Sequence, residues 1–108
     1  MNNFETILII ASDTTKDNLN KINKSFEEII AAQGGSIIGK EDCGLRDLAY
    51  KINSLKKAFY FFYQINIDNQ KIKALKEKIS LNEKIIRYLF IKVNEHEKLP
   101  TIMHKGNE

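Results

Sequence analysis

The segment at residues 58–67 limits the fold most strongly, because a run of aromatic and β-branched residues is typical of a β-strand. Its two alternating sets of side chains differ in polarity, as expected for a sheet that is covered on one side only. We expect the more apolar set to face a layer of helices, and its members are Phe59, Phe61, Tyr63, Ile65 and Ile67. The other set belongs to the open face of the sheet and contains Tyr60, Phe62, Gln64 and Asn66.

Three further segments predict strands of the same sheet. Residues 5–11 form an apolar run that includes both alternating sets, which indicates a central strand covered on both sides. Residues 85–93 predict the last strand, and residues 36–39 predict a short strand. The polar segment 40–57 contains only short apolar alternations, so we expect that short strand to continue into a long hairpin connection.

Two segments with apolar residues at steps of three and four predict amphipathic helices. The first begins at a capping box formed by Thr14 and Asp17 and ends at Gly34 and Gly35. Its apolar stripe consists of Leu19, Ile22, Phe26, Ile29 and Ile30. The second is capped at Asp68 and Asn69, with an inward stripe of Ile72, Leu75 and Ile79 and outward lysines at positions 71, 73, 76 and 78.

The predicted order is strand, helix, strand, strand, helix, strand, which defines the ferredoxin-like split βαβ arrangement, an α+β fold. Four antiparallel strands would carry both helices on one face, with the first and third strands in the centre. We expect a single domain over residues 1–94. Residues 95–108 are polar and without periodicity, so we expect a mobile tail there.

Positive charge is concentrated in two parts of the chain. The 17 lysines and arginines exceed the 14 acidic residues by only three. Residues 71–92 nevertheless hold seven basic against two acidic groups, and residues 40–57 hold five against three. These cations could neutralise the phosphates of a nucleic acid, although lysines on a helix exterior are more often a solvated surface.

Several classes of protein are disfavoured by what the chain lacks. Its longest apolar runs are far shorter than the roughly 20 residues of a membrane-spanning helix, and its first residues lack a basic leader, so we expect a soluble, uncleaved protein. A lone cysteine, Cys43, rules out an internal disulfide. With no zinc-site spacing and no glycine-rich phosphate loop, we expect no metal and no cofactor.

Catalytic groups are also scarce. His96 and His104 both fall in or beside the polar tail, where a general base could not keep its geometry. Cys43 follows Glu41 and Asp42, whose charges would raise the pKa of its thiol and so disfavour a nucleophile. The sequence therefore predicts that the protein is not an enzyme.

A resemblance to a known family rests on several quoted segments. Residues 44–53, followed by residues 56–60, closely resemble the signature of the small-subunit ribosomal protein S six family of bacteria and organelles. Similarity extends to residues 4–10, 81–83 and 86–87. It covers about residues 3–94. The sequence departs from the family pattern at Cys43, where an aromatic residue is common, and at Lys51, where a proline is common.

The resemblance implies a non-catalytic ferredoxin-like domain of the small ribosomal subunit, in the bacterial cytoplasm or an organelle matrix. It also implies that the domain pairs with ribosomal protein S eighteen and binds the central domain of small-subunit ribosomal RNA. For RNA contact we select Arg46, Arg87, Lys56, Lys57 and Lys92, since arginine can bind a phosphate in a bidentate way. For the protein partner we select Tyr50, Ile52, Leu89 and Ile91.

Alternatives remain open at this point. Arg46 could instead form a salt bridge within the hairpin, and the ring of Tyr50 could be packed rather than bound to a partner. Tyr60 and Phe62 could stack RNA bases, as in an RNA-recognition motif, although core packing is the simpler interpretation. Two other functions share the topology: an acylphosphatase-like hydrolase, disfavoured because the turn after the first strand has no arginine, and a dimer that binds a small effector.

Overall fold

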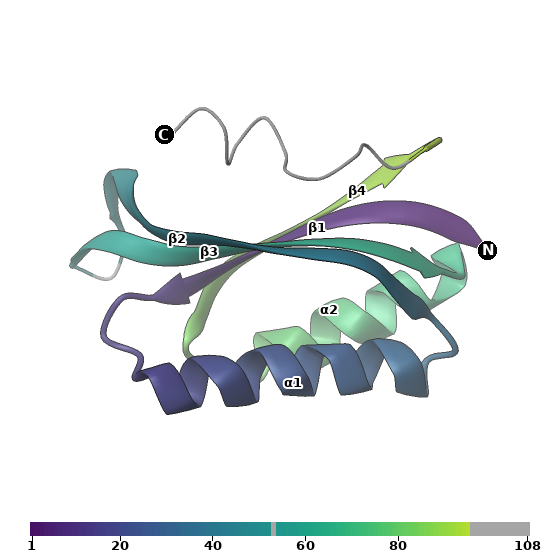
Figure 1. Cartoon of the computed structure of the whole chain (residues 1–108), viewed down its shortest axis with the longest axis horizontal. Coiled ribbons are helices and arrows are strands. Elements are labelled where there is room, and N and C mark those ends of the chain that lie inside the picture. Colours follow the sequence, from purple (N-terminus) through teal and green to yellow (C-terminus); the bar gives the residue numbers. More distant parts are fainter. Residues whose placement is uncertain (53, 96–108) are drawn as a thin grey trace.

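A computed structural model describes residues 1–52 and 54–95, which form one four-stranded antiparallel sheet with two helices on the same face (Figure 1). The elements, in order, are β1 Asn2–Ala11, α1 Lys16–Ala32, β2 Ser36–Ile52, β3 Leu55–Ile67, a 3-10 turn Asn69–Lys71, α2 Ile72–Ser80 and β4 Ile85–Val93. The strands lie in the order β2-β3-β1-β4. The predicted ferredoxin-like fold is confirmed, with the first and third strands in the centre.

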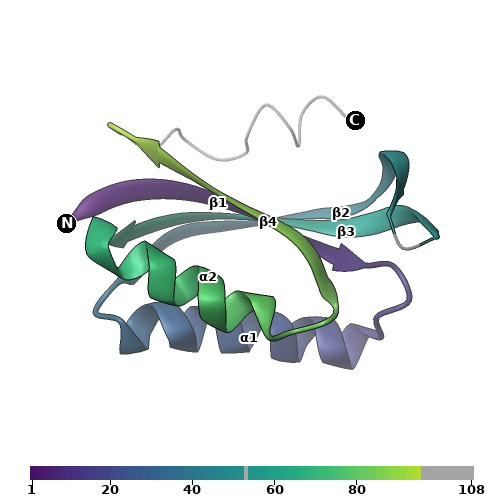
Figure 2. The same ribbon diagram turned by 180° about the vertical axis from the view of Figure 1, so that it is seen from behind.

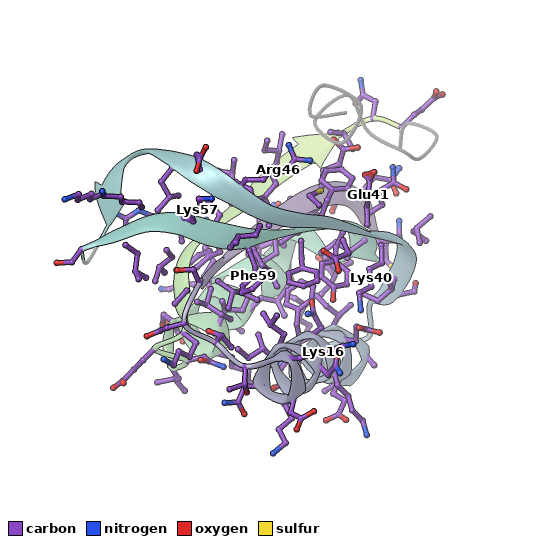
Figure 3. The ribbon with its side chains drawn as sticks, turned by 60° about the vertical axis from the view of Figure 1, so that its left-hand side comes forward. Lys16, Lys40, Glu41, Arg46, Lys57 and Phe59 are labelled. Atoms are coloured by element: carbon purple, nitrogen blue, oxygen red, sulfur yellow. The ribbon has the colours of Figure 1, made fainter. Side chains whose placement is uncertain are left out.

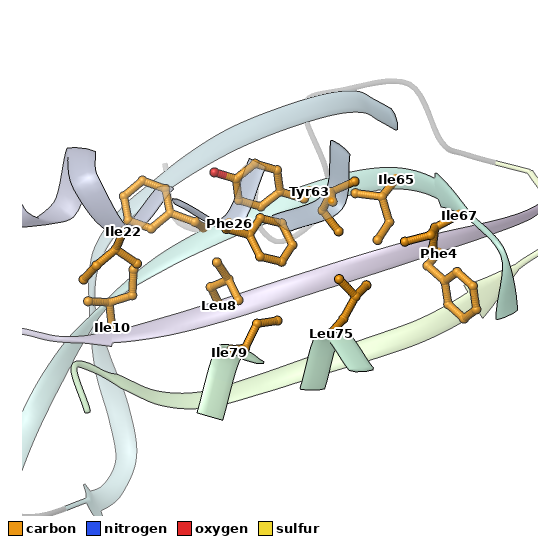
Figure 4. Packing of buried hydrophobic residues seen from close by; sticks show 12 residues of the cluster. Phe4, Leu8, Ile10, Ile22, Phe26, Tyr63, Ile65, Ile67, Leu75 and Ile79 are labelled. Carbon is orange, nitrogen blue, oxygen red and sulfur yellow. The ribbon is translucent and has the colours of Figure 1, made fainter. Parts of the chain in front are cut away.

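The hydrophobic core lies between the sheet and the two helices (Figures 2 and 4). In β1, the buried set Phe4, Thr6, Leu8 and Ile10 alternates with Glu5, Ile7 and Ile9, which are partly exposed. The expectation that β1 is covered on both sides is therefore wrong, because both helices pack against one face. The remaining apolar side chains of β1 lie on the open face, together with a row from β3.

The ends of α1 follow from local chemistry. The helix begins at Thr15, whose hydroxyl oxygen accepts a hydrogen bond of 3.2 Å from the backbone N–H of Asn18. The predicted capping box at Thr14 is therefore displaced by one residue, and Thr14 itself is buried. After the helix, Gly34 has a φ of +79°, which glycine accepts without a Cβ penalty, so the chain reverses where the sequence predicted.

The hairpin of β2 and β3 is much longer than expected. β2 continues to Ile52 and β3 begins at Leu55, so most of the segment predicted as a connection is paired strand. Its ladder is interrupted by register shifts, one of them between Asp42 and Gly44. We call residues 44–58 the hairpin arm, because the paired strands extend here past the helices in Figure 1. Periodicity could not show these strands, since the arm has little core to face.

The rest of the described chain agrees with the sequence predictions. Asp68 caps the 3-10 turn through the backbone N–H of Gln70, and β4 has the predicted bounds. No helix in the described residues is long and apolar enough to cross a membrane. The predicted mobile tail comprises residues 95–108, of which residues 96–108 lie outside the described part.

One polar cluster joins α1 to the sheet inside the core. The hydroxyl of fully buried Tyr63 donates to Asn23 Oδ1 at 2.6 Å and lies 3.3 Å from Glu27 Oε2. Lys40 Nζ is 3.3 Å from the same glutamate oxygen and 5.7 Å from the centroid of the Tyr63 ring. The cluster satisfies a buried hydroxyl and fixes the position of α1 relative to β2 and β3.

Replacing the hydroxyl of Tyr63 should destabilise the fold. In Tyr63→Phe the carboxamide oxygen of Asn23 remains buried without its donor, which costs about 1 to 3 kcal/mol. The matched control is Tyr60→Phe on the open face, which should change the free energy of unfolding by about 0.5 kcal/mol or less. Urea unfolding measures both values, and equal losses in the two variants would contradict a structural role for the Tyr63 cluster.

The same cluster predicts a pH dependence. Burial, and then the charge of Glu27, raise the pKa of the Tyr63 hydroxyl above its ordinary value of about 10. The unfolded chain therefore loses this proton at a lower pH than the folded chain. The stabilisation is complete below about pH 10 and is lost as the pH rises further. The stability difference between the wild type and Tyr63→Phe should shrink above that pH, whereas a constant difference would contradict this assignment.

Candidate functional site

The open face of the sheet has an apolar centre built by three strands. Ile7 lies between Phe62 of β3 and Leu89 of β4, and Ile9 lies between Tyr60 and Arg87. Phe62 is only 7% exposed although no helix covers it, and it lies between Ile7 of β1 and Glu41 of β2. Leu89 and Ile91 on the edge strand are 50% and 46% exposed, so the apolar centre reaches solvent along β4.

Two arginines border this centre on the same face. Arg87 is opposite Ile9 at the β4 edge, and Arg46 is opposite Ala58 at the β2 edge. Figure 3 shows Arg46 on the side of the sheet away from α1. Three strand spacings of about 4.8 Å separate the two edges, which places the arginine backbones about 14 Å apart across the sheet.

Backbone carbonyls orient both guanidinium groups. Arg46 Nε donates to the carbonyl of Cys43 at 2.9 Å, and Arg87 Nη1 donates to the carbonyl of Ile86 at 3.1 Å. Arg46 is partly buried and Arg87 is exposed. A guanidinium has five N–H donors, so one backbone bond at Arg87 leaves donors for an anion.

The hairpin arm carries the next two predicted RNA contacts. Lys56 and Lys57 are exposed near the start of β3, and Lys57 Nζ lies 3.8 Å from Asp47 Oδ1 on the opposite strand (Figure 3). The side chains of this pair are 58% and 83% exposed, so solvent weakens their attraction. A phosphate could therefore replace the carboxylate at little cost.

The direction of the arm is set by a bulge at Gly44. This residue has a φ of +76°, and its N–H donates to Asp42 Oδ1 at 2.8 Å. The ladder shifts register at the same place. Bulges bend a strand and increase its twist, so Gly44 directs the arm and also influences where Arg46 lies.

Cys43 is buried beside this bulge and is 8% exposed. Burial raises the pKa of its thiol first, and the charge of Glu41 raises it further, while Arg46 lowers it. The predicted direction of the shift is confirmed, with burial as its main cause. A thiol that stays protonated is a poor nucleophile.

The structure unites some of the predicted site residues and separates others. Arg46, Arg87, Leu89 and Ile91 share the open face. Lys92 does not, because it is opposite Phe4 and therefore lies on the helix side of β4. Tyr50 and Ile52 belong to β2, but their side chains are outside the described part, as are His96 and His104.

The contribution of β1 to this surface was not predicted from the sequence. Ile7 and Ile9 were attributed to a strand covered on both sides, yet they lie at the centre of the open face. The sequence contained an indication of this surface. Both alternating sets of side chains in β1 are apolar, although the predicted sheet is covered by helices on one face only. An apolar row on the uncovered side of such a sheet indicates a surface that another molecule can cover.

Comparisons with known proteins agree in sequence and in fold. The family model described as "Ribosomal protein S6" matches residues 3–92. The chain is 41% identical over 106 residues to small ribosomal subunit protein bS6 of Rickettsia prowazekii (strain Madrid E), covering 98% of this chain and 88% of that protein. It is 31% identical over 96 residues to bS6 of Christiangramia forsetii, covering 89% and 86% of the two chains.

A solved structure shows the same fold. The crystal structure of 30S ribosomal protein S6 from Thermotoga maritima matches with a TM-score of 0.81 at 22% sequence identity. The match covers 85% of this chain and 87% of that one. The sequence match and the fold match therefore both extend over most of the chain.

Because of the bulge, we expect Gly44→Ala and Gly44→Asn to lower the stability of the fold by different amounts. No atom lies within 4 Å of a Cβ added there, so the cost of Gly44→Ala is that of the backbone conformation alone, about 1 to 2 kcal/mol. Asparagine adopts positive φ more readily, so Gly44→Asn should lose less stability. Thermal or urea unfolding compares the two variants, and an equal or larger loss in Gly44→Asn would contradict this role of the bulge.

Proposed function

The chain belongs to the ribosomal protein S6 family, and on that premise we propose that it binds the central domain of small-subunit ribosomal RNA together with ribosomal protein S eighteen. It is a structural, non-catalytic protein of the small ribosomal subunit. This membership removes the hydrolase and effector-binding alternatives. The proposal places the chain on ribosomes of a bacterial cytoplasm or an organelle matrix.

The observation that carries the proposal is the pair Arg46 and Arg87 at opposite borders of one apolar surface. The centre of the surface suits a protein, because exposed apolar side chains such as Leu89 and Ile91 gain free energy when a partner removes them from water. The borders suit RNA, because guanidinium groups bind phosphate oxygens in a bidentate way. A partner on the centre would let both arginines reach RNA that passes beside it.

The hairpin arm extends the positive border on the β2 side. Lys56 shares the open face with Arg46, because it lies two residues before Ala58, the partner of Arg46 in the ladder. Lys57 is opposite Asp47 and therefore lies on the other face of the hairpin arm. Contacts of this kind fix the orientation of the protein on RNA without reading the bases. Specificity then comes from the shape of the RNA and from S eighteen. In this proposal S eighteen contacts Tyr50 and Ile52 of β2 and the exposed residues Leu89 and Ile91 of β4. Lys92 would make a separate RNA contact from the helix side.

Binding to a central-domain RNA fragment, measured with and without S eighteen over a salt series, tests the proposal. We expect tight binding only with the partner. Arg46→Ala and Arg87→Ala should each weaken it by about tenfold or more, because each removes charged hydrogen bonds worth about 1.5 to 3 kcal/mol. The logarithmic salt slope should also fall by about 0.9 for each lost phosphate contact.

Two controls make this experiment specific. Lys24→Ala removes one exposed charge from the middle of α1, on the other side of the sheet, and should leave the affinity nearly unchanged. Leu89→Asp places a charge at the apolar centre and should remove the gain that S eighteen provides. If the arginine variants bind like the wild type, or if S eighteen has no effect, the proposed function is wrong.

A further inference from the structure

A polar groove lies in the helix layer, on the opposite side of the domain from the open face. One cavity of about 330 Å³ is lined by Asn18, Lys21, Ile22, Ser25, Asn82 and Lys84. An adjoining shallow and open depression shares Ser25, Asn82 and Lys84 with it and is also lined by Lys78. We call these residues together the lysine groove. Figure 2 shows its two sides, the first turns of α1 and the connection from α2 to β4.

Helix α1 provides one wall of the groove. Asn18, Lys21 and Ser25 are spaced by three and four residues, so they lie on one face of the helix. Ile22, which is only 6% exposed, lies between them and belongs to the hydrophobic core. The polar wall is therefore attached to a helix that the core holds in place.

The connection after α2 provides the other wall, and hydrogen bonds fix it. The N–H of Asn82 donates to the carbonyl of Ile79, and the N–H of Ile85 donates to the carbonyl of Asn82, both at 3.1 Å. Asn82 Oδ1 accepts from the N–H of Lys84 at 3.0 Å. Because this oxygen is engaged with the backbone, the amide group of the Asn82 side chain supplies hydrogen-bond donors at the groove.

Charge in the groove is positive and partly uncompensated. Lys84 Nζ forms a salt bridge of 3.2 Å with Asp13, and Glu83 lines the open depression. Lys21 and Lys78 form no ion pair with any residue in the described part of the chain. The lining therefore has three lysines and one carboxylate, Glu83, while Asp13 pairs with Lys84 and Asp17 lies one helical turn before Lys21. Lysines gathered along one groove raise the local positive potential, which favours the approach of an anion.

We propose that the lysine groove binds one backbone phosphate of ribosomal RNA, as a second RNA contact on the helix side of the domain. The inference rests on the chain being a small-subunit protein, but it does not depend on the binding mode of the open face. Lysine, asparagine and serine are among the side chains that commonly contact RNA and DNA phosphates, and all three line the groove. The chain would then touch RNA on two opposite sides.

A titration of the full chain with inorganic phosphate tests the groove by itself. Backbone amide resonances are followed by NMR at constant ionic strength, with sodium chloride as the reference salt. Signals of Ser25 and Asn82 should shift and saturate with phosphate only. The variant Lys21→Ala/Lys78→Ala should lose this response. The control Lys24→Ala/Lys73→Ala removes the same charge from exposed positions of α1 and α2 outside the groove, and should keep it.

The same two double variants are then compared for binding to the RNA fragment with S eighteen. The groove variant should reduce the salt slope by about 0.9, which corresponds to one phosphate, and the control should reduce it less. Equal effects of the two variants, or an unsaturable phosphate response, would overturn the groove proposal. If Arg46→Ala and Arg87→Ala weaken RNA binding while the groove variants do not, the groove proposal alone fails. If the groove variant weakens RNA binding while Arg46→Ala and Arg87→Ala do not, the proposed function is wrong and the groove proposal is supported.

Discussion

The pairing of β1 with β3 on one side and β4 on the other determines most of this structure. The β1–β3 register runs without a break from Asn2 opposite Ile67 to Ala11 opposite Ala58. This ladder fixes which side chains of the central strands face the helices. A slip of one residue would turn the side chains of one strand to the other face and expose either Leu8 of β1 or Tyr63 of β3, both of which are fully buried. The free energy that such exposure would cost maintains the register. The register in turn determines on which face of the sheet the candidate site residues lie.

The proposed binding surface is a consequence of covering one face of the sheet only. With both helices on one side, the sheet leaves Ile7, Ile9 and Phe62 without a helix above them, and the edge strands add Leu89 and Arg87. The hairpin arm adds positive charge beyond the core, on exposed side chains such as Lys56 and Lys57. The helix layer has its own polar groove. The domain therefore offers separate surfaces to its surroundings while its core stays intact.

The sequence predicted the element order and the strand positions because burial leaves a periodic pattern. The stripe of α1 and the alternation at residues 58–67 are both consequences of facing one core. Where side chains do not face the core, the pattern fails: the strands of the hairpin arm were predicted as a connection, and the helix cap was placed at Thr14 instead of Thr15. Backbone hydrogen bonds determine the strands of the hairpin arm and the position of the helix cap, and the pattern of side chains in the sequence does not indicate which backbone groups are paired.

The candidate site was predictable in part for the same reason. Arg46 and Arg87 were selected from the family resemblance, but only the register shows that they share a face and that Lys92 does not. The lysine groove was not found, because its walls come from residues 18–25 and 78–84, which are far apart in the sequence. Of its lysines, only Lys78 was considered individually, as part of the outward surface of the second helix. Proximity across elements depends on helix packing, which a single sequence does not specify.

The most direct measurement is a structure of an assembled small ribosomal subunit that contains this chain. The account predicts that a neighbouring protein covers Ile7, Phe62 and Leu89. It also predicts that Arg46 and Arg87 lie within about 3 Å of RNA phosphate oxygens at the two borders of the covered surface. A subunit in which the open face of the sheet is exposed to solvent, with both arginines away from RNA, would contradict the account.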